Sequence, residues 1–154
     1  MRSVVSALAS SGLPAERLEL EITETVLMDE SDTVMKTLEQ LRELGVRIAL
    51  DDFGTGYSSL GYLRRFAVDK IKIDRSFIHE IGNRDTAAIV RAIIRLGGEL
   101  GITVTAEGVE TTAQLDQLRK EGCVEAQGFL IGVPSTAKDI LRLLRPAAPI
   151  RQSG

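Results

Sequence analysis

Five short segments of the chain alternate apolar and polar side chains with the two-residue period of a β-strand. In the first of them, Leu20 and Ile22 alternate with Glu19 and Glu21. The five segments cover residues 18–23, 46–51, 69–74, 102–107 and 123–128. Because successive side chains of a strand point to opposite faces, each segment is predicted to have one apolar and one polar face.

Between these strands the chain has the spacing of amphipathic helices. Helices are predicted over residues 1–14, 31–44 and 85–100, after an N-cap at Thr111 or Thr112, and after an N-cap at Thr136. The regular alternation of strand and helix predicts parallel βαβ units.

The helix predicted over 85–100 contains many small apolar residues. Its packing face is predicted to consist of Ala88, Ile89, Ala92, Ile93 and Leu96. We expect Gly97 and Gly98 to weaken this helix by about 1 kcal/mol each relative to alanine.

The polar strand faces favour a (β/α) barrel. A doubly wound sheet is covered by helices on both faces and therefore has apolar residues on both. Here the apolar faces are predicted to meet an outer layer of helices, and the polar faces to line a lumen. A barrel of eight units takes about 250 residues, so 154 residues correspond to about five of the eight units. The fold class is therefore α/β, either a partial TIM-like barrel or a smaller open sheet.

Composition and charge narrow the possible partners. The net charge is −3 and the isoelectric point about 5.3, which disfavours a nucleic-acid polymer as partner. No run of 18 apolar residues or signal peptide is seen, so no membrane partner is expected. Cys123 is the only cysteine, which is typical of a cytoplasmic protein without disulfides.

Polar residues close the predicted strands. The strand ends carry Glu21, Asp51, Asp52, Lys72, Glu107 and Gln127. In a barrel, strand ends of this kind form the active site. The four acids could hold two divalent ions, Mg²⁺ or Mn²⁺, which together activate water for attack on a phosphodiester. Lys72 could orient that water, and Gln127 could donate a hydrogen bond to the ligand.

Each of these residues also has an ordinary structural interpretation. The Asp-Asp-x-Gly stretch that begins at Asp51 is common in simple turns. Lys70 and Lys72 could be strand-edge charges, and Glu107 and Glu110 could favour the dipole of a helix N-terminus. The hypothesis of a site depends on several such residues falling on one strand face and one end.

Five ordered motifs make the chain resemble the EAL-domain family of bacterial cyclic di-GMP phosphodiesterases. The motifs are LELEITET (18–25), LDDFGTGYSSL (50–60), DKIKIDRSFI (69–78), TAEGVET (105–111) and AQGFLIGVP (126–134). The resemblance implies a TIM-like barrel that opens cyclic di-GMP to the linear dinucleotide pGpG.

The resemblance also implies roles for individual residues. Glu21 and Asp51 match ligands of a first metal ion, and Asp51, Asp52 and Glu107 match ligands of a second. Lys72 matches the lysine that contacts the hydrolytic water, so Lys72, Glu107 and Asp52 are the expected catalytic residues. The remaining matches are Glu24, which steadies the Asp-Asp-Phe-Gly-Thr-Gly loop, the site glutamine Gln127, and two secondary candidates, Glu110 and Asp74.

The chain departs from the family at its N-terminal side. The Glu-Ala-Leu signature is absent, and about three strands of the barrel are not represented. We therefore expect residues 1–146 to form a partial EAL domain and 147–154 a flexible tail. Such a chain is expected to be inactive or nearly so alone, and to form homodimers or associate through its open barrel edges.

Two other functions remain open from the sequence alone. The first is a non-catalytic module that binds cyclic di-GMP or serves regulation and dimerisation. The second is a phosphoacceptor domain of the five-stranded flavodoxin-like class, against which the polar strand faces argue.

Overall fold

A computed structural model describes residues 1–28, 32–54, 56, 63 and 68–143. Its five strands form one parallel sheet in the order of the sequence. They are β1 (Glu19–Thr23), β2 (Arg47–Phe53), β3 (Lys70–Ile73), β4 (Thr103–Ala106) and β5 (Glu125–Ala126). Because every crossover leads to the neighbouring strand and the order never reverses, the sheet resembles part of a barrel wall rather than a doubly wound sheet. The predicted α/β fold with five parallel strands is confirmed.

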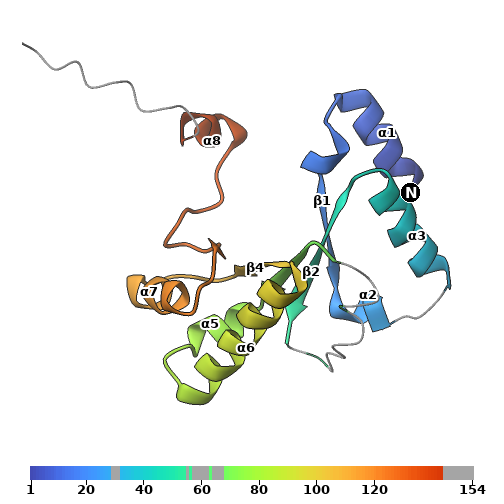
Figure 1. Ribbon diagram of the computed structural model, residues 1–154. Helices are drawn as coiled ribbons and strands as arrows, with labels where there is room; N and C mark the ends of the chain where they lie inside the picture. The colour runs from blue at the N-terminus through green and yellow to red at the C-terminus, as the bar shows by residue number, and fades with distance from the viewer. Residues whose placement is uncertain (29–31, 55, 57–62, 64–67, 144–154) are drawn as a thin grey trace, which may run out of the picture.

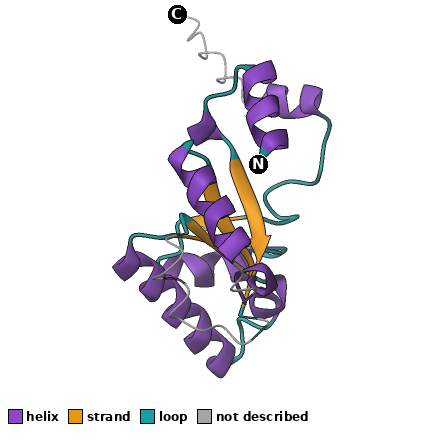
Figure 2. Cartoon of the chain, turned by 90° about the vertical axis from the view of Figure 1, so that its right-hand side faces the viewer, coloured by secondary structure: helices purple, strands orange, loops and turns teal. Residues whose placement is uncertain are grey.

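Helices lie outside the strands (Figures 1 and 2). They are α1 (Arg2–Ser11), the 3₁₀ turn η1 (Ala15–Arg17), α2 (Glu24–Met28), α3 (Asp32–Glu43), α5 (Arg75–His79), α6 (Arg84–Leu100), α7 (Thr112–Lys120) and α8 (Ala137–Leu143). The amphipathic spacing predicts α1, α3, α6, α7 and α8. It does not predict η1, α2 and α5, which are too short to show a helical period.

The ends of several helices follow from local chemistry. Gly12 and Gly101 end α1 and α6 in the left-handed conformation, with φ angles of 67° and 69°, which glycine adopts without steric cost. Thr111 begins α7 through a capping box with Gln114: the hydroxyl of Thr111 accepts from the Gln114 amide, and the Gln114 side chain accepts from the Thr111 amide.

The packing face of α6 differs from the prediction. The buried residues are Ala87, Val90, Ile93, Ile94 and Gly97, whereas Ile89 is 47% exposed. The close approach of α6 to the sheet explains this rotation, because a Cβ at Gly97 would overlap Cγ2 of Val104 on β4. Gly97 is therefore the contact point of the helix, and not simply a weak position within it.

The strand faces are divided as predicted. On β2 and β3, the side chains of Ile48, Leu50, Ile71 and Ile73 are buried against the helices. The alternate residues form the opposite face, here called the lumen face, which includes Glu19, Glu21, Lys70, Lys72 and Thr105. No covering helix layer is needed on this face, because its polar side chains contact one another.

The described part of the sheet has two open edges, since β1 and β5 each pair with one strand only. Beyond β5 the chain runs away from the sheet to α8 (Figure 1), and on this segment Ile131 and Val133 are more than half exposed. Val124, just before β5, is also more than half exposed. The tail expected over 147–154 lies outside the described residues. Among the helices that the structure describes, none has the length and apolar character needed to cross a membrane.

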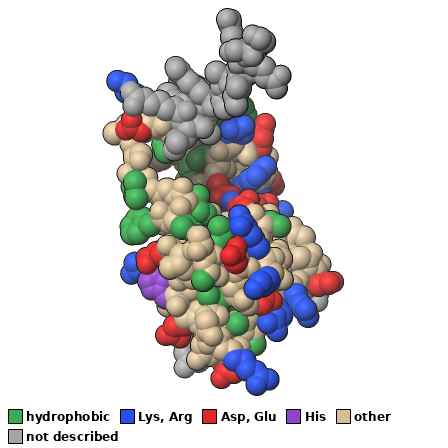
Figure 3. Space-filling view, turned by 90° about the vertical axis from the view of Figure 1, so that its left-hand side faces the viewer, with side chains coloured by type: hydrophobic (Ala, Val, Ile, Leu, Met, Phe, Trp, Pro, Cys, Tyr) green, Lys and Arg blue, Asp and Glu red, His purple; other side chains and the backbone are tan. Residues whose placement is uncertain are grey.

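The surface carries no large region of a single charge in the view of Figure 3. Acidic and basic side chains are intermixed over this face wherever residues are described. This distribution agrees with the net charge of −3. It gives no support for binding a long polyanion, which requires a continuous basic surface.

Candidate metal and catalytic centre

Adjacent carboxylates on β2 reach the same site because the strand is bulged. The register between β2 and β3 shifts between Leu50 and Phe53, and Asp52 lies in the left-handed region with φ 55°. A regular strand would direct Asp51 and Asp52 to opposite faces, whereas an extra residue in the left-handed conformation re-aims one of them. The strand then continues through Phe53, which is buried.

Three acids gather at the carboxyl end of the strands, here called the rim. Asp51, Asp52 and Glu107 each place a carboxylate oxygen within 4.8 Å of the others. Asp51 and Asp52 come from β2, and Glu107 follows β4 directly. At such a separation, unneutralised carboxylates repel one another by several kcal/mol at an effective dielectric constant of about 20. The cluster therefore favours a cation.

Lys72 supplies positive charge from the central strand. Its Nζ lies 2.7 Å from Glu21 Oε1, 3.0 Å from Asp51 Oδ1 and 2.8 Å from Glu107 Oε1. The residue is only 6% exposed. Burial alone would lower the pKa of Lys72, but hydrogen bonds with Glu107, Glu21 and Asp51 outweigh it and raise the pKa above the ordinary value. Lys72 is therefore a donor that stays protonated at neutral pH in the middle of the acids.

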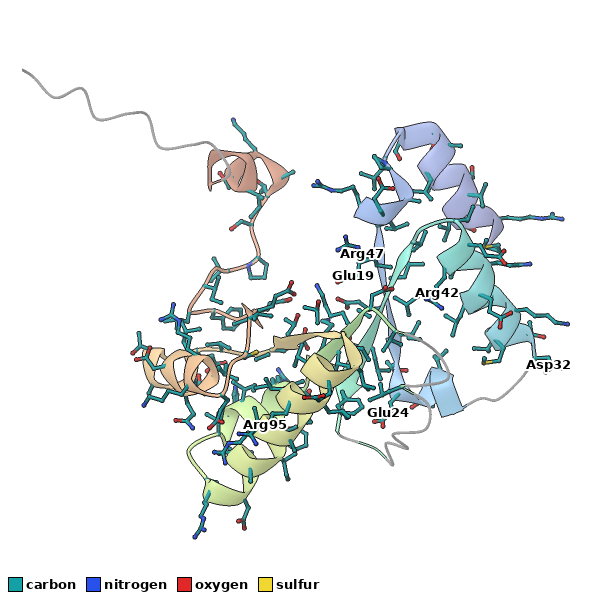
Figure 4. All side chains as sticks on the ribbon, viewed as in Figure 1. Glu19, Glu24, Asp32, Arg42, Arg47 and Arg95 are labelled. Carbon is teal, nitrogen blue, oxygen red and sulfur yellow. The ribbon has the colours of Figure 1, made fainter. Side chains whose placement is uncertain are left out.

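Glu24 lies close to Gly56, which follows β2 in the sequence. It begins α2 and is 8% exposed, and Figure 4 labels it near the lower end of β1. A Cβ at Gly56 would lie 3.0 Å from its Oε2 atom, so the carboxylate and the Gly56 backbone are in close contact. Apart from Gly54 and Gly56, residues 54–60 of the motif lie outside the described part of the chain.

A hollow of about 440 Å³ opens beside the acids at the rim. It is lined by Asp52, Asp74, Arg75, Glu107, Gly108, Glu110, Gln127, Gly128 and Phe129. Five of the residues predicted for the site from the sequence therefore line one cavity: Asp52, Asp74, Glu107, Glu110 and Gln127. Gly108, with φ 70°, allows Arg75 to approach closely, because a Cβ at Gly108 would overlap that of Arg75.

Asp74 and Glu110 also have structural partners. The Asp74 carboxylate caps α5 by accepting a hydrogen bond of 3.0 Å from the Ser76 amide. Burial, the largest single cause, would raise the pKa of Asp74, but the hydrogen bonds from Ser76 and the hydrogen bond and charge of Arg75 together outweigh it, so its pKa lies below the ordinary value. Glu110 lies 3.4 Å from His79 Nε2. Asp74 therefore positions α5 at the edge of the hollow, and the strand pattern alone did not indicate this.

Sequence reasoning missed two residues of the hollow, Arg75 and Phe129. Arg75 lies on α5, which was not predicted, and Phe129 follows β5 with 65% of its surface exposed. Each lies within a quoted motif, Arg75 in DKIKIDRSFI and Phe129 in AQGFLIGVP, and that membership was the available signal.

A model of the family described as the EAL domain matches residues 1–134 of the chain. The cyclic di-GMP phosphodiesterase NbdA of Pseudomonas aeruginosa is 47% identical over 94% of this chain and 19% of NbdA. The bifunctional diguanylate cyclase/cyclic di-GMP phosphodiesterase MucR of the same organism is 49% identical over 90% of this chain and 20% of MucR. The chain thus spans about a fifth of the length of these curated relatives.

Solved structures agree with this match. The MucR phosphodiesterase in complex with cyclic di-GMP superposes with a TM-score of 0.85 and 48% identity, over 90% of this chain and 57% of that chain. A manganese and cyclic di-GMP complex of BlrP1 from Klebsiella pneumoniae superposes with a TM-score of 0.78 and 41% identity, over 82% of this chain and 33% of that chain. The described sheet therefore corresponds to part of the barrel of these proteins.

Proposed function

Because this chain belongs to the EAL-domain family, we propose that it supplies the metal-binding acids and the water-orienting lysine of a cyclic di-GMP phosphodiesterase. The observation that carries the proposal is the position of Lys72. Its ammonium group contacts carboxylates from β1, from β2 and from the end of β4 at one point of the rim. An ion-pair network with a structural role alone would not require these residues to lie beside a cluster of acids with metal-ligand spacing.

The acids at the rim fit a hard divalent cation. Carboxylate oxygens are the ligands that Mg²⁺ and Mn²⁺ prefer, and Asp51, Asp52 and Glu107 present three of them close together. We assign Glu21 and Asp51 to one ion, and Asp51, Asp52 and Glu107 to a second. A pair of such ions lowers the pKa of bound water and stabilises the leaving oxygen of a phosphodiester.

Lys72 acts as a hydrogen-bond donor in this proposal. Since its raised pKa keeps it protonated at neutral pH, it cannot serve as the general base. It can donate to the attacking water and hold the oxygen in line with the phosphorus. It also offsets the negative charge that develops on the phosphoryl oxygens.

Cyclic di-GMP is the substrate that the relatives suggest. The MucR and BlrP1 structures are complexes with this dinucleotide. Its two phosphodiesters are anionic, so the acids at the rim would repel it unless cations neutralise them. Arg75, in the rim hollow with Gln127 and Phe129, offers a cation, an amide and an aromatic face for phosphate and base.

Grafting tests this proposal. Residues 1–134 of the chain replace the matching part of the MucR phosphodiesterase domain, and hydrolysis of cyclic di-GMP to pGpG is measured with Mn²⁺. We expect turnover by the graft and its loss in Asp51→Asn and Lys72→Met. The matched control is Asp116→Asn, an exposed acid on α7. A folded graft without turnover, or one that tolerates Asp51→Asn, contradicts the proposal.

A second candidate is a non-catalytic module that binds cyclic di-GMP, and the two open edges of the described sheet favour it. A lumen that is open on one side admits water and weakens every ion pair inside it. Calorimetry on the 154-residue chain with cyclic di-GMP and Ca²⁺ distinguishes the two. Binding in Ca²⁺, with no cleavage by the graft in Mn²⁺, identifies the module.

A further inference from the structure

A second ion-pair network lies directly below the rim acids on the lumen face. Lys70 Nζ lies 3.1 Å from Glu19 Oε2 on β1 and 2.9 Å from Glu125 Oε2 on β5. Thr105 on β4 donates a hydrogen bond of 2.8 Å from Oγ1 to the same Glu125 oxygen. Lys70 therefore bridges the two edge strands of the sheet, although it comes from the central one.

This network repeats the rim network two residues earlier on three strands. Glu19 precedes Glu21, Lys70 precedes Lys72, and Thr105 precedes Glu107. A spacing of two residues places side chains on the same strand face about 6–7 Å apart. The lumen therefore contains two layers, each with one lysine of β3 between acids that other elements supply. We call Glu19 and Glu125 the lower acids.

The separation into layers matters because lysine is flexible and its ammonium is a point charge. With Lys70 present, each lysine has its own acids: the lower acids for Lys70, and Glu21, Asp51 and Glu107 for Lys72. Without the charge of Lys70, the lower acids would be only partly neutralised. They would then compete for the Lys72 ammonium group and draw it away from the rim.

Arg47 is the other cation near the lower layer. It lies beside Glu19 at the amino end of the strands (Figure 4), but its side chain makes no ion pair among the contacts described for this part of the chain. Its residue is exposed to solvent, where a charge is well screened. Lys70, at 19% side-chain exposure, is the more effective neutralising group.

We propose that Lys70 is a positioning residue: by neutralising Glu19 and Glu125, it holds the ammonium group of Lys72 on the rim carboxylates. The proposal rests on the proposed function for its purpose, since Lys72 is the lysine that orients water there. Its physical content stands by itself, because it concerns contacts of the chain without any metal ion or substrate. Lys70 acts through Lys72 and does not touch the reacting atoms.

The test measures Lys72 directly. Exchange of the Lys72 ammonium protons with water is followed by ¹⁵N NMR on the 154-residue chain without metal. In Lys70→Met we expect this exchange to become about tenfold faster, because ion pairs that protect the ammonium protons are lost. Lys70→Arg keeps the charge and should preserve slow exchange. Unchanged exchange in Lys70→Met overturns the proposal.

A charge cycle separates positioning from general destabilisation. In a chain with Glu19→Gln and Glu125→Gln, no lower acids remain to compete for Lys72. Adding Lys70→Met to this background should then leave the exchange rate within about threefold. A further tenfold acceleration there shows that Lys70 acts through packing, and contradicts the proposal. This comparison also serves if Lys70→Met alone fails to fold.

If the proposed phosphodiesterase function is wrong, the experiments give a different pattern from the one expected if the positioning role of Lys70 is wrong. A folded graft that does not hydrolyse cyclic di-GMP removes the phosphodiesterase role but leaves the exchange rates of Lys72 unaffected. Normal turnover in a graft that carries Lys70→Met, together with unchanged exchange of Lys72, removes the positioning role alone.

Discussion

Lys72 Nζ lies 2.8 Å from Glu107 Oε1, although the two residues are 35 positions apart and belong to different βα units. Parallel pairing of β3 with β4 brings them together, because Lys72 pairs with Thr105 and Glu107 follows two residues later on the same face. The sequential order of the sheet therefore places acids from several strands around one ammonium group.

Removing the Lys72 side chain should destabilise the fold and increase the stabilisation that a bound metal ion provides. Lys72→Met leaves Glu21, Asp51 and Glu107 without their shared cation, which should lower the free energy of unfolding by about 3 kcal/mol. Mn²⁺ should recover more stability in this variant than in the parent chain, since it can replace the missing charge. Urea unfolding with and without Mn²⁺ measures both effects, with the exposed Lys36→Met as control.

The contribution of Lys72 to stability should decline at alkaline pH. Its pKa in the folded chain is raised, so its stabilisation is complete below the unfolded pKa of about 10.4 and declines as pH rises further. The stability difference between the parent and Lys72→Met should therefore be constant from pH 7 to 9 and smaller at pH 11. A difference that grows with pH would show that the ion pairs are not its origin.

Asp52→Gly should make the fold more stable and weaken its binding of metal ions. A non-glycine residue at φ 55° carries a steric cost of about 1 kcal/mol, and the carboxylate also repels Asp51 and Glu107. Glycine removes both, so we expect unfolding at a higher urea concentration together with weaker Mn²⁺ binding. Asp52→Asn is the control: it keeps the backbone preference and removes only the charge. Loss of stability in Asp52→Gly would contradict the strained bulge.

Adjacent glycines of α6 should respond in opposite directions to alanine. Gly97→Ala forces a methyl group into Val104, and overpacking of this kind costs about 1–3 kcal/mol. Nothing lies within 4 Å of a Cβ at Gly98, so Gly98→Ala should stabilise the helix by up to about 1 kcal/mol. Thermal unfolding of the two variants distinguishes this packing from a model in which both glycines merely weaken the helix.

The chain should also associate with itself. Two open strand edges and the exposed Val124, Ile131 and Val133 favour contacts between copies. Sedimentation velocity should detect species heavier than the 16.7 kDa monomer, and Ile131→Ser with Val133→Ser should reduce them. Leu13→Ser is the control, because Leu13 is an exposed leucine that follows α1, far from Ile131 in the sequence. It should leave the amount of the heavier species unchanged.

The sequence predicts the strand faces well because their period depends on local geometry alone. Glu21, Lys72 and Glu107 could be assigned to one face from alternation, and the structure places them in contact. The packing face of α6 could not be read in this way, because a helix rich in alanine and isoleucine offers several apolar stripes. Only the approach of Gly97 to Val104 on β4 decides between them.

The bulge at Asp52 is a second feature beyond sequence reasoning. The alternation predicts a strand that ends at residue 51, whereas β2 continues to Phe53 and a register shift turns the side chain of Asp52. Such a shift depends on pairing with β3, which is distant in the sequence. The same applies to Arg75 in the hollow, since it depends on the contact between α5 and Gly108.

Titration with Mn²⁺, followed by electron paramagnetic resonance of the free ion, tests most directly whether the rim acids bind divalent cations. The parent chain should show saturable binding at neutral pH, and Glu107→Gln should weaken it by about tenfold or more. Glu121→Gln, an acid paired with Arg91 away from the rim, should bind as the parent does. Equal titration curves for the parent chain and Glu107→Gln would contradict the assignment of these carboxylates as the metal site.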